Sequence, residues 1–135
     1  GSAALLAAGP LLMAGAAPAL GSAEVRSQRL LRALVLLAMA CTSGAFALDM
    51  AGHLQAGLDP RAQAWSATVG MLLGYQGFHV AVVLLMGGYV LARSWSGRLQ
   101  PAARATLDNT LLMWHCVTAQ GLLAALAVQL APRLA

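Results

Sequence analysis

The sequence has very little charge for its length. Only 9% of its 135 residues are charged, lysine is absent, and there are only four acidic residues, whereas 60% are hydrophobic. An ordinary soluble domain is roughly a quarter charged. Small soluble domains are mostly surface, so a chain of this composition cannot cover a globule with polar groups. We therefore predict an integral membrane protein, with lipid as the solvent of its outer surface.

Other shortages exclude further classes of protein. Aromatic residues make up only 5% of the chain, and no stretch alternates apolar and polar residues with a period of two, which argues against a β-barrel. Cys41 and Cys116 both fall inside apolar segments. We interpret them as small packing residues, and two cysteines so far apart form no metal-binding motif. Zinc motifs, phosphate-binding loops and serine nucleophile motifs are likewise missing, so we expect no catalytic residue and no metal site in this chain.

Four apolar runs indicate the fold. Leucine, alanine and glycine dominate them, which suits helices that approach one another closely. The first run is near the minimum length for a membrane span and carries Pro10 and Pro18. We predict an all-α, transmembrane four-helix bundle that forms a single domain over residues 1–135. The predicted spans are 3–20, 30–50, 62–92 and 106–130.

The chain opens on Gly1 rather than methionine, and its first run lacks the basic leading region of a signal peptide. We therefore expect a piece of a longer polypeptide.

The arginines predict the orientation of these helices. Six of the eight fall in two short stretches, which suits membrane orientation better than a nucleic-acid surface. Two crossings separate the stretches, so both lie on one side, which is cytoplasmic by the positive-inside rule. We expect a bacterial inner-membrane protein whose C-terminus is periplasmic. The arginines are Arg26, Arg29, Arg32, Arg93, Arg98 and Arg104, the last three accompanied by the helix breakers Gly97 and Pro101.

Asp49 and His53 form the first candidate site. They lie one helical turn apart near the predicted outer end of the second span, where they form either a partly hydrated interfacial pair or a proton-relay or lipid-headgroup site. The second interpretation requires a partner from another helix. Trp65 and Trp95 lie near opposite ends of the third span, where indoles favour the membrane interface.

His79 and His115 lie deep in the third and fourth spans. Two histidines on different membrane helices can ligate a haem iron, as in a small membrane cytochrome b that exchanges electrons with quinone. The simpler interpretation, which we favour, is that each imidazole hydrogen-bonds across the bundle and holds the helices in register. A four-helix transporter or assembly factor is a third alternative.

Glycines on the third span indicate a packing surface. Gly70, Gly74 and Gly77 lie on one flank, followed by the pair Gly87 and Gly88, and small residues at this spacing allow a neighbouring helix to approach closely. On the fourth span, Asp108 falls in the first turn, where a carboxylate complements the helix dipole. We expect an interface on the third span and a helix cap at Asp108.

The last two spans resemble subunit III of the haem-copper cytochrome c oxidases. That family has a Gly-Phe-His-Gly-Leu-His-Val signature, then an arginine, then a Trp-His-Phe-Val motif. Here the stretch 74–80 reads Gly-Tyr-Gln-Gly-Phe-His-Val, with glutamine replacing the first histidine, and Arg93 and the stretch 114–117, Trp-His-Cys-Val, follow at compatible spacing. Asp49 falls where the family often has a glutamate. The first span lacks the family's Trp-Ala-His-His motif, and Thr118 replaces an aspartate. Residues 106–110 look like the subunit III-like tail fused to subunit I in some bacterial oxidases.

This resemblance implies an accessory domain without redox centres. Such a domain packs on catalytic subunit I of a terminal oxidase, which holds the haem and copper, and binds phospholipid while supporting proton-coupled oxygen reduction by cytochrome c or quinol oxidases. Gly74, Gly77, His79, Arg93, Trp114 and His115 would then be structural motif residues, and Asp49, His53, Trp65, Trp95 and Arg98 would face lipid or a subunit interface. The arginine count gives the same orientation as the family topology.

Overall fold

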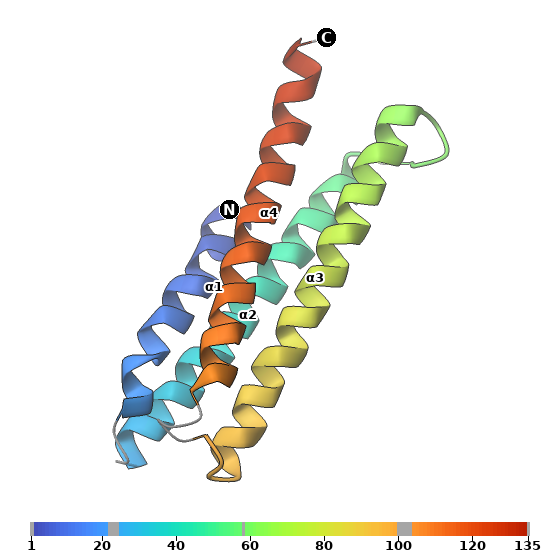
Figure 1. Cartoon of the computed structure of the whole chain (residues 1–135). Coiled ribbons are helices and arrows are strands. Elements are labelled where there is room, and N and C mark those ends of the chain that lie inside the picture. Colours follow the sequence, from blue (N-terminus) through green and yellow to red (C-terminus); the bar gives the residue numbers. More distant parts are fainter. Residues whose placement is uncertain (1, 22–24, 58, 100–103, 135) are drawn as a thin grey trace.

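Four α-helices of alternating direction make up the described part of the chain, residues 2–21, 25–57, 59–99 and 104–134 of a computed structural model. The helices pack side by side (Figure 1). The second and fourth helices start at the end of the bundle where the first and third finish. The expected all-α bundle is confirmed. The elements are α1 (Ser2–Ala16), the 3-10 turn η1 (Pro18–Gly21), α2 (Val25–Gln55), α3 (Ala64–Trp95) and α4 (Ala105–Leu134).

Three of these helices are long and apolar enough to cross a membrane, not four. The segments that qualify are Val25–Gln55, Ala64–Trp95 and Ala105–Leu130, whereas α1 has only 15 residues. At 1.5 Å per residue, α1 is shorter than a hydrocarbon core of about 30 Å. Of the predicted spans, 3–20 therefore corresponds to a shorter apolar helix rather than to one of the three long ones. The α-helix ends just before Pro18, where the chain continues as η1. Pro10 lies within α1 and is buried.

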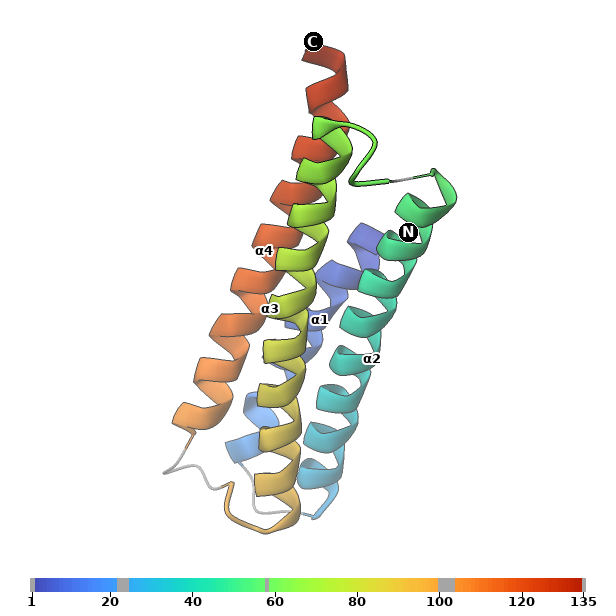
Figure 2. The same cartoon turned by 90° about the vertical axis from the view of Figure 1, so that its right-hand side faces the viewer.

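The arginine-bearing stretches lie at one end of the bundle, as predicted (Figure 2). Most of these arginines lie in helix ends rather than in loops. Arg26, Arg29 and Arg32 belong to the start of α2, and Arg93 belongs to the last turn of α3. Gly97 has a φ of 68°, a left-handed conformation that suits glycine and turns the chain after α3. Pro101, predicted as a second breaker, lies outside the described residues.

Side chains from all four helices form the core. Trp114 of α4 is completely buried, and its indole Nε1 donates a hydrogen bond of 2.8 Å to Thr42 Oγ1 of α2. Around it, α1 contributes Met13 and α2 contributes Val35. The outward faces remain apolar, with Met71 80% exposed and Leu85 75% exposed. Such faces would be unfavourable in water and are what lipid requires.

Candidate functional site

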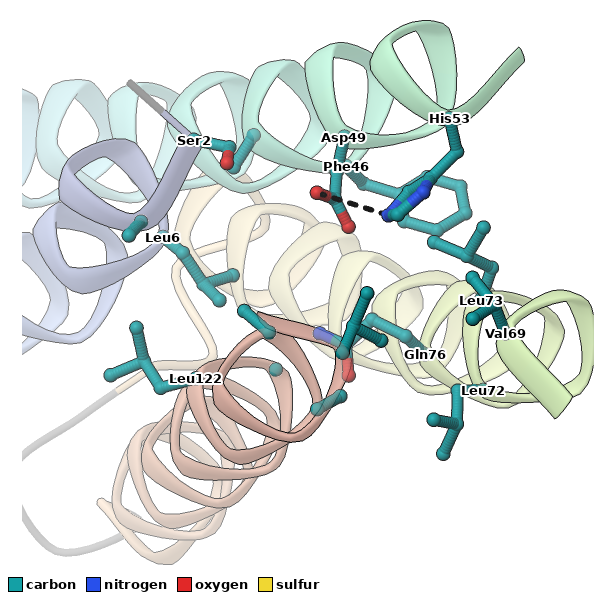
Figure 3. A pocket seen from close by; sticks show the side chains of 16 residues that line it. Ser2, Leu6, Phe46, Asp49, His53, Val69, Leu72, Leu73, Gln76 and Leu122 are labelled. Atoms are coloured by element: carbon teal, nitrogen blue, oxygen red, sulfur yellow. Dashed lines mark ion pairs between the residues drawn. The ribbon is translucent and has the colours of Figure 1, made fainter. Parts of the chain in front are cut away.

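A partly open cavity lies between the four helices, near the end of α2 and the start of α3 (Figure 3). Its volume is about 60 Å³. Most of the lining is aliphatic, with Leu6 from α1, Leu73 from α3 and Leu122 from α4. Four polar side chains also line it, namely Ser2, Asp49, His53 and Gln76. This combination of an apolar wall with a few polar groups is typical of ligand sites.

Asp49 and His53 belong to the same face of α2, and the structure pairs them. His53 Nε2 lies 4.0 Å from Asp49 Oδ1, with the Asp49 side chain 41% exposed and that of His53 26% exposed. The dashed line in Figure 3 marks this ion pair at the cavity wall. The proton-relay or headgroup interpretation required a partner from another helix. Gln76 of α3 is a polar side chain from another helix that lines the same cavity, but it makes no hydrogen bond to either residue.

Gln76 is the residue that sequence reasoning undervalued. It is 6% exposed, and its Nε2 donates a hydrogen bond of 3.3 Å to the backbone oxygen of Val117 in α4. Its Oε1 is buried and has no hydrogen-bond partner among the described residues. A buried amide oxygen without a donor costs roughly 1–3 kcal/mol. The signal in the sequence was a glutamine in the interior of an apolar helix, where polar groups are expensive.

Small residues make room for this arrangement. A Cβ added at Gly121 of α4 would lie 2.6 Å from Leu6 Cδ2 and 2.7 Å from Gln76 Nε2. Glycine therefore lets α4 approach α1 and α3 closely enough for the Gln76 bond to form. A second tie runs from Thr118 Oγ1, which donates to the backbone oxygen of Leu6 at 3.3 Å.

The two histidines proposed as cross-bundle ties do not have that role. The imidazole Nδ1 of His79 donates to the backbone oxygen of Tyr75 at 2.9 Å, within α3, and its ring packs against those of Tyr75 and Phe78. His115 is exposed on α4. The ties between helices come instead from Trp114, Thr118 and Gln76.

Nor does the geometry favour a haem held between His79 and His115. The α4 residues that line a groove shared with α3 are Thr106, Asn109 and Thr110. Helical spacing of three and four residues continues that side of α4 through Met113 and Val117, each nearly half a turn away from His115. His115 therefore points away from α3.

The glycines of α3 divide into two groups. A Cβ at Gly70 would meet Pro60 at 3.1 Å, and one at Gly77 would meet the ring of Phe46 in α2 at 2.8 Å. Gly87 similarly faces Met39 and Trp114. Gly74 and Gly88 have nothing within 4 Å of an added Cβ, so these two glycines line an unpartnered outer face.

The remaining predicted site residues lie near the helix ends. Trp65 and Trp95 are exposed, in the first turn and at the last residue of α3. Arg93 donates to Thr106 Oγ1 at 3.4 Å and to the backbone oxygen of Arg98 at 3.2 Å, which braces the turn between α3 and α4, while Arg98 itself is exposed.

The sequence also assigned roles to Asp108 and to the two cysteines. Asp108 was predicted to cap α4, and it accepts two hydrogen bonds from Arg104, at 2.9 and 3.1 Å, that raise the pKa of this guanidinium. Cys116 was predicted to be a packing residue but is exposed, whereas Cys41 is half-buried. The expected packing role of Cys116 inside the bundle is therefore wrong.

Comparisons with protein-family models, with curated proteins and with solved structures found no match to this chain. The likeness to oxidase subunit III therefore remains a prediction from its short motifs.

Proposed function

We propose that this chain is an accessory, non-redox domain of a respiratory terminal oxidase. It docks on the catalytic subunit through the outer face of α3, lies in the bacterial inner membrane with its arginine-bearing end in the cytoplasm, and has its C-terminus in the periplasm. The partner subunit holds the haem and copper and carries out electron transfer, and this chain supplies a packing surface.

The observation that carries this proposal is the unpartnered small-residue line on α3. Gly74 and Gly88 are open, and Ala81 between them is exposed, so small residues recur at intervals of seven along one outward face. In lipid, helices associate through close backbone approach at small residues, because apolar burial gives no driving force there. This face can therefore receive a partner helix without changing the bundle behind it.

The choice of an oxidase rests on the two motif stretches. The two stretches contact each other, because Gln76 of the stretch 74–80, at the position where this chain departs from the family's histidine, bonds to the Val117 backbone of the stretch 114–117. Trp114 of the second stretch is also the largest fully buried side chain. Contact between the two stretches agrees with a shared structural unit and supports the proposal.

The test is association in native membranes. An affinity-tagged full chain is expressed in its own organism, extracted in mild detergent and isolated with its partners. Gly74→Leu adds bulk to the outer face, where the isolated chain has open space, so we expect an unchanged thermal midpoint and a loss of about tenfold in recovered haem-copper subunit. Gly44→Leu adds the same bulk on α2, at a glycine whose added Cβ also has nothing within 4 Å, so it is the matched control and should retain the subunit.

Equal recovery of the haem-copper subunit with wild type and Gly74→Leu would contradict docking through this face. Recovery of the wild-type chain without any haem-copper subunit would contradict the oxidase assignment itself.

A further inference from the structure

One ionisable side chain on the outer surface of the bundle has no partner within it. His115 is exposed on α4, about 15 Å from the start of the apolar segment Ala105–Leu130 at 1.5 Å per residue, which places it well inside a hydrocarbon core of about 30 Å. Trp114 and Thr118 of the same helix hydrogen-bond within the bundle, whereas His115 makes no side-chain hydrogen bond with the described residues. An imidazole at this depth is unfavourable in lipid unless another polar group reaches it.

His79 of α3 shows how a membrane histidine is satisfied without a neighbouring helix. Its Nδ1 donates to the backbone oxygen of Tyr75, and its ring packs against those of Tyr75 and Phe78. The side chain of His115 has no such bond to its own helix. Its hydrogen-bond partner therefore has to come from outside the bundle.

The residues around His115 form a stripe that suits a second helix. Leu112, Ala119 and Leu126 follow one another at intervals of seven, His115 lies between the first two, and all four are exposed. The helix packs against α1 and α3, and its outer side faces the viewer in Figure 1. A spacing of seven keeps one side of a helix against a neighbour in a left-handed pair, and the small Ala119 allows the two backbones to approach closely.

The chemistry of His115 favours a second copy of this chain as the neighbour. A neutral imidazole has one N–H donor and one nitrogen acceptor, so it can hydrogen-bond to an identical group. Two copies share one orientation in the membrane, and a two-fold axis along the membrane normal brings the same residue of each copy to the same depth. The sequence between Leu112 and Leu126 contains no charged residue that would select a partner of opposite sign.

We propose that two copies of this chain associate through the outer stripe of α4. The imidazole of His115 hydrogen-bonds to that of the second copy, and Ala119 packs against its equivalent one turn further along. Leu112 and Leu126 extend the contact on either side. The stripe belongs to α4 alone, so the pairing leaves the packing within each bundle unchanged.

Self-association goes beyond docking on an oxidase and does not depend on it. The proposed docking face is the outer surface of α3, whereas the stripe lies on α4. Gly74→Leu should leave self-association unchanged, and His115→Leu should leave recovery of the haem-copper subunit unchanged. The two proposals can therefore fail separately.

The experiment is disulfide cross-linking in native membranes. Ala119→Cys is introduced into the full chain after Cys41→Ala and Cys116→Ala have removed its own thiols, and the membranes are oxidised with copper phenanthroline. A disulfide forms only where two Cα atoms come within about 7 Å, which requires closely paired helices. We expect a covalent dimer of twice the mass of the chain, identified by mass spectrometry and reversed by a reductant.

Ala47→Cys in the same cysteine-free chain is the matched control. Ala47 is exposed on α2 at a similar depth, because the neighbouring Phe46 lies against Gly77 of α3 while Gln76 bonds to Val117 of α4. The proposal places no second copy against this face. We expect at least about tenfold less covalent dimer from Ala47→Cys than from the α4 variant.

Two substitutions of His115 in the Ala119→Cys chain test the hydrogen bond itself. His115→Leu removes the polar group and keeps an apolar surface, and it should slow cross-linking by about three- to tenfold, the range that one interhelical hydrogen bond gives in a membrane. His115→Asn retains a donor and an acceptor and should restore most of the rate. Apolar packing alone would not rank asparagine above leucine.

Absence of a covalent dimer from Ala119→Cys would overturn the proposal, because lipid would then cover the stripe. A cross-link from this position to a different protein would overturn it as well, since the neighbour would not be a second copy. Equal rates with His115 and with His115→Leu would contradict the role given to the imidazole.

Discussion

The two ends of this bundle are built differently. At the arginine-bearing end, polar side chains tie the helices together: Arg32 of α2 donates to Ser94 Oγ at 2.9 Å and to the Ser94 backbone oxygen at 2.8 Å, and Ser94 donates in turn to Gln28. At the other end, Gln76 leaves an acceptor unpaired beside a cavity. One end is tied together by side-chain hydrogen bonds, and the other contains a cavity beside an unpaired acceptor.

The difference follows from the side chains available at each end. Arginine offers five donors in a planar fork, so Arg32 can satisfy a hydroxyl and a carbonyl on a facing helix at once. At the cavity end, Gln76 Oε1 is buried without a hydrogen-bond partner among the described residues. Trp114 and Thr42 mark the border between these two regions, below the cavity and within the core.

The largest effect is expected where the packed region borders the cavity. Trp114→Ala removes a fully buried indole and its bond to Thr42, leaving a void continuous with the core. We expect a loss of about 3–5 kcal/mol in the free energy of unfolding. Unfolding by sodium dodecyl sulfate, followed by far-UV circular dichroism, measures it. Trp95→Ala, at the exposed end of α3, is the control and should change the free energy by less than about 0.5 kcal/mol.

A smaller loss is expected at the arginine-bearing end. Arg32→Ala removes both hydrogen bonds to Ser94, and hydrogen bonds to charged groups contribute about 1.5–3 kcal/mol. The same unfolding measurement should show a loss within that range. Arg29→Ala removes an exposed arginine three residues earlier on α2 and should have little effect. Equal losses in the two variants would mean that net charge, and not the tie to Ser94, stabilises this end.

The smallest expected difference is between two glycine-to-alanine substitutions, one beside the Trp114–Thr42 hydrogen bond and one beside the cavity. A Cβ at Gly9 would lie 2.7 Å from Trp114 Nε1 and 2.8 Å from Thr42 Oγ1, which a hydrogen bond holds in place, so Gly9→Ala should cost about 1–3 kcal/mol. At Gly121 the obstacles are the ends of Leu6 and Gln76, which can move into the cavity. Gly121→Ala should therefore cost less, under about 1 kcal/mol. The opposite order would show that the cavity end is the more rigid one.

Hydropathy and arginine positions were sufficient to predict the helical class, the three long helices and the common end of the arginines, because apolar length and charge placement are local properties. The failure at α1 has a local cause too, since Pro18 shortens an apolar run that composition alone counts as a span. The start of α2 extends beyond the prediction because arginine is compatible with helix and can be accommodated outside the hydrocarbon region.

The candidate site was only half predictable. Asp49 and His53 are one turn apart, so helical periodicity was enough to pair them. Gln76 reaches the same cavity because of how α3 is rotated about its axis relative to α2. That rotation depends on the packing of Phe46 against Gly77 and on the hydrogen bond from Gln76 to α4. For the same reason the roles of His79 and His115 were predicted wrongly as ties, because the face of a helix that meets its neighbour is set by the tertiary packing.

The measurement that tests the functional account most directly is an absorption spectrum of the wild-type chain, purified from its native membranes, together with mass identification of everything recovered with it. We predict that a haem-copper catalytic subunit accompanies the chain, and that the chain separated from this subunit shows no Soret band. Stoichiometric haem on the separated chain, lost on substitution of His79 or His115, would contradict the account and establish a membrane cytochrome instead.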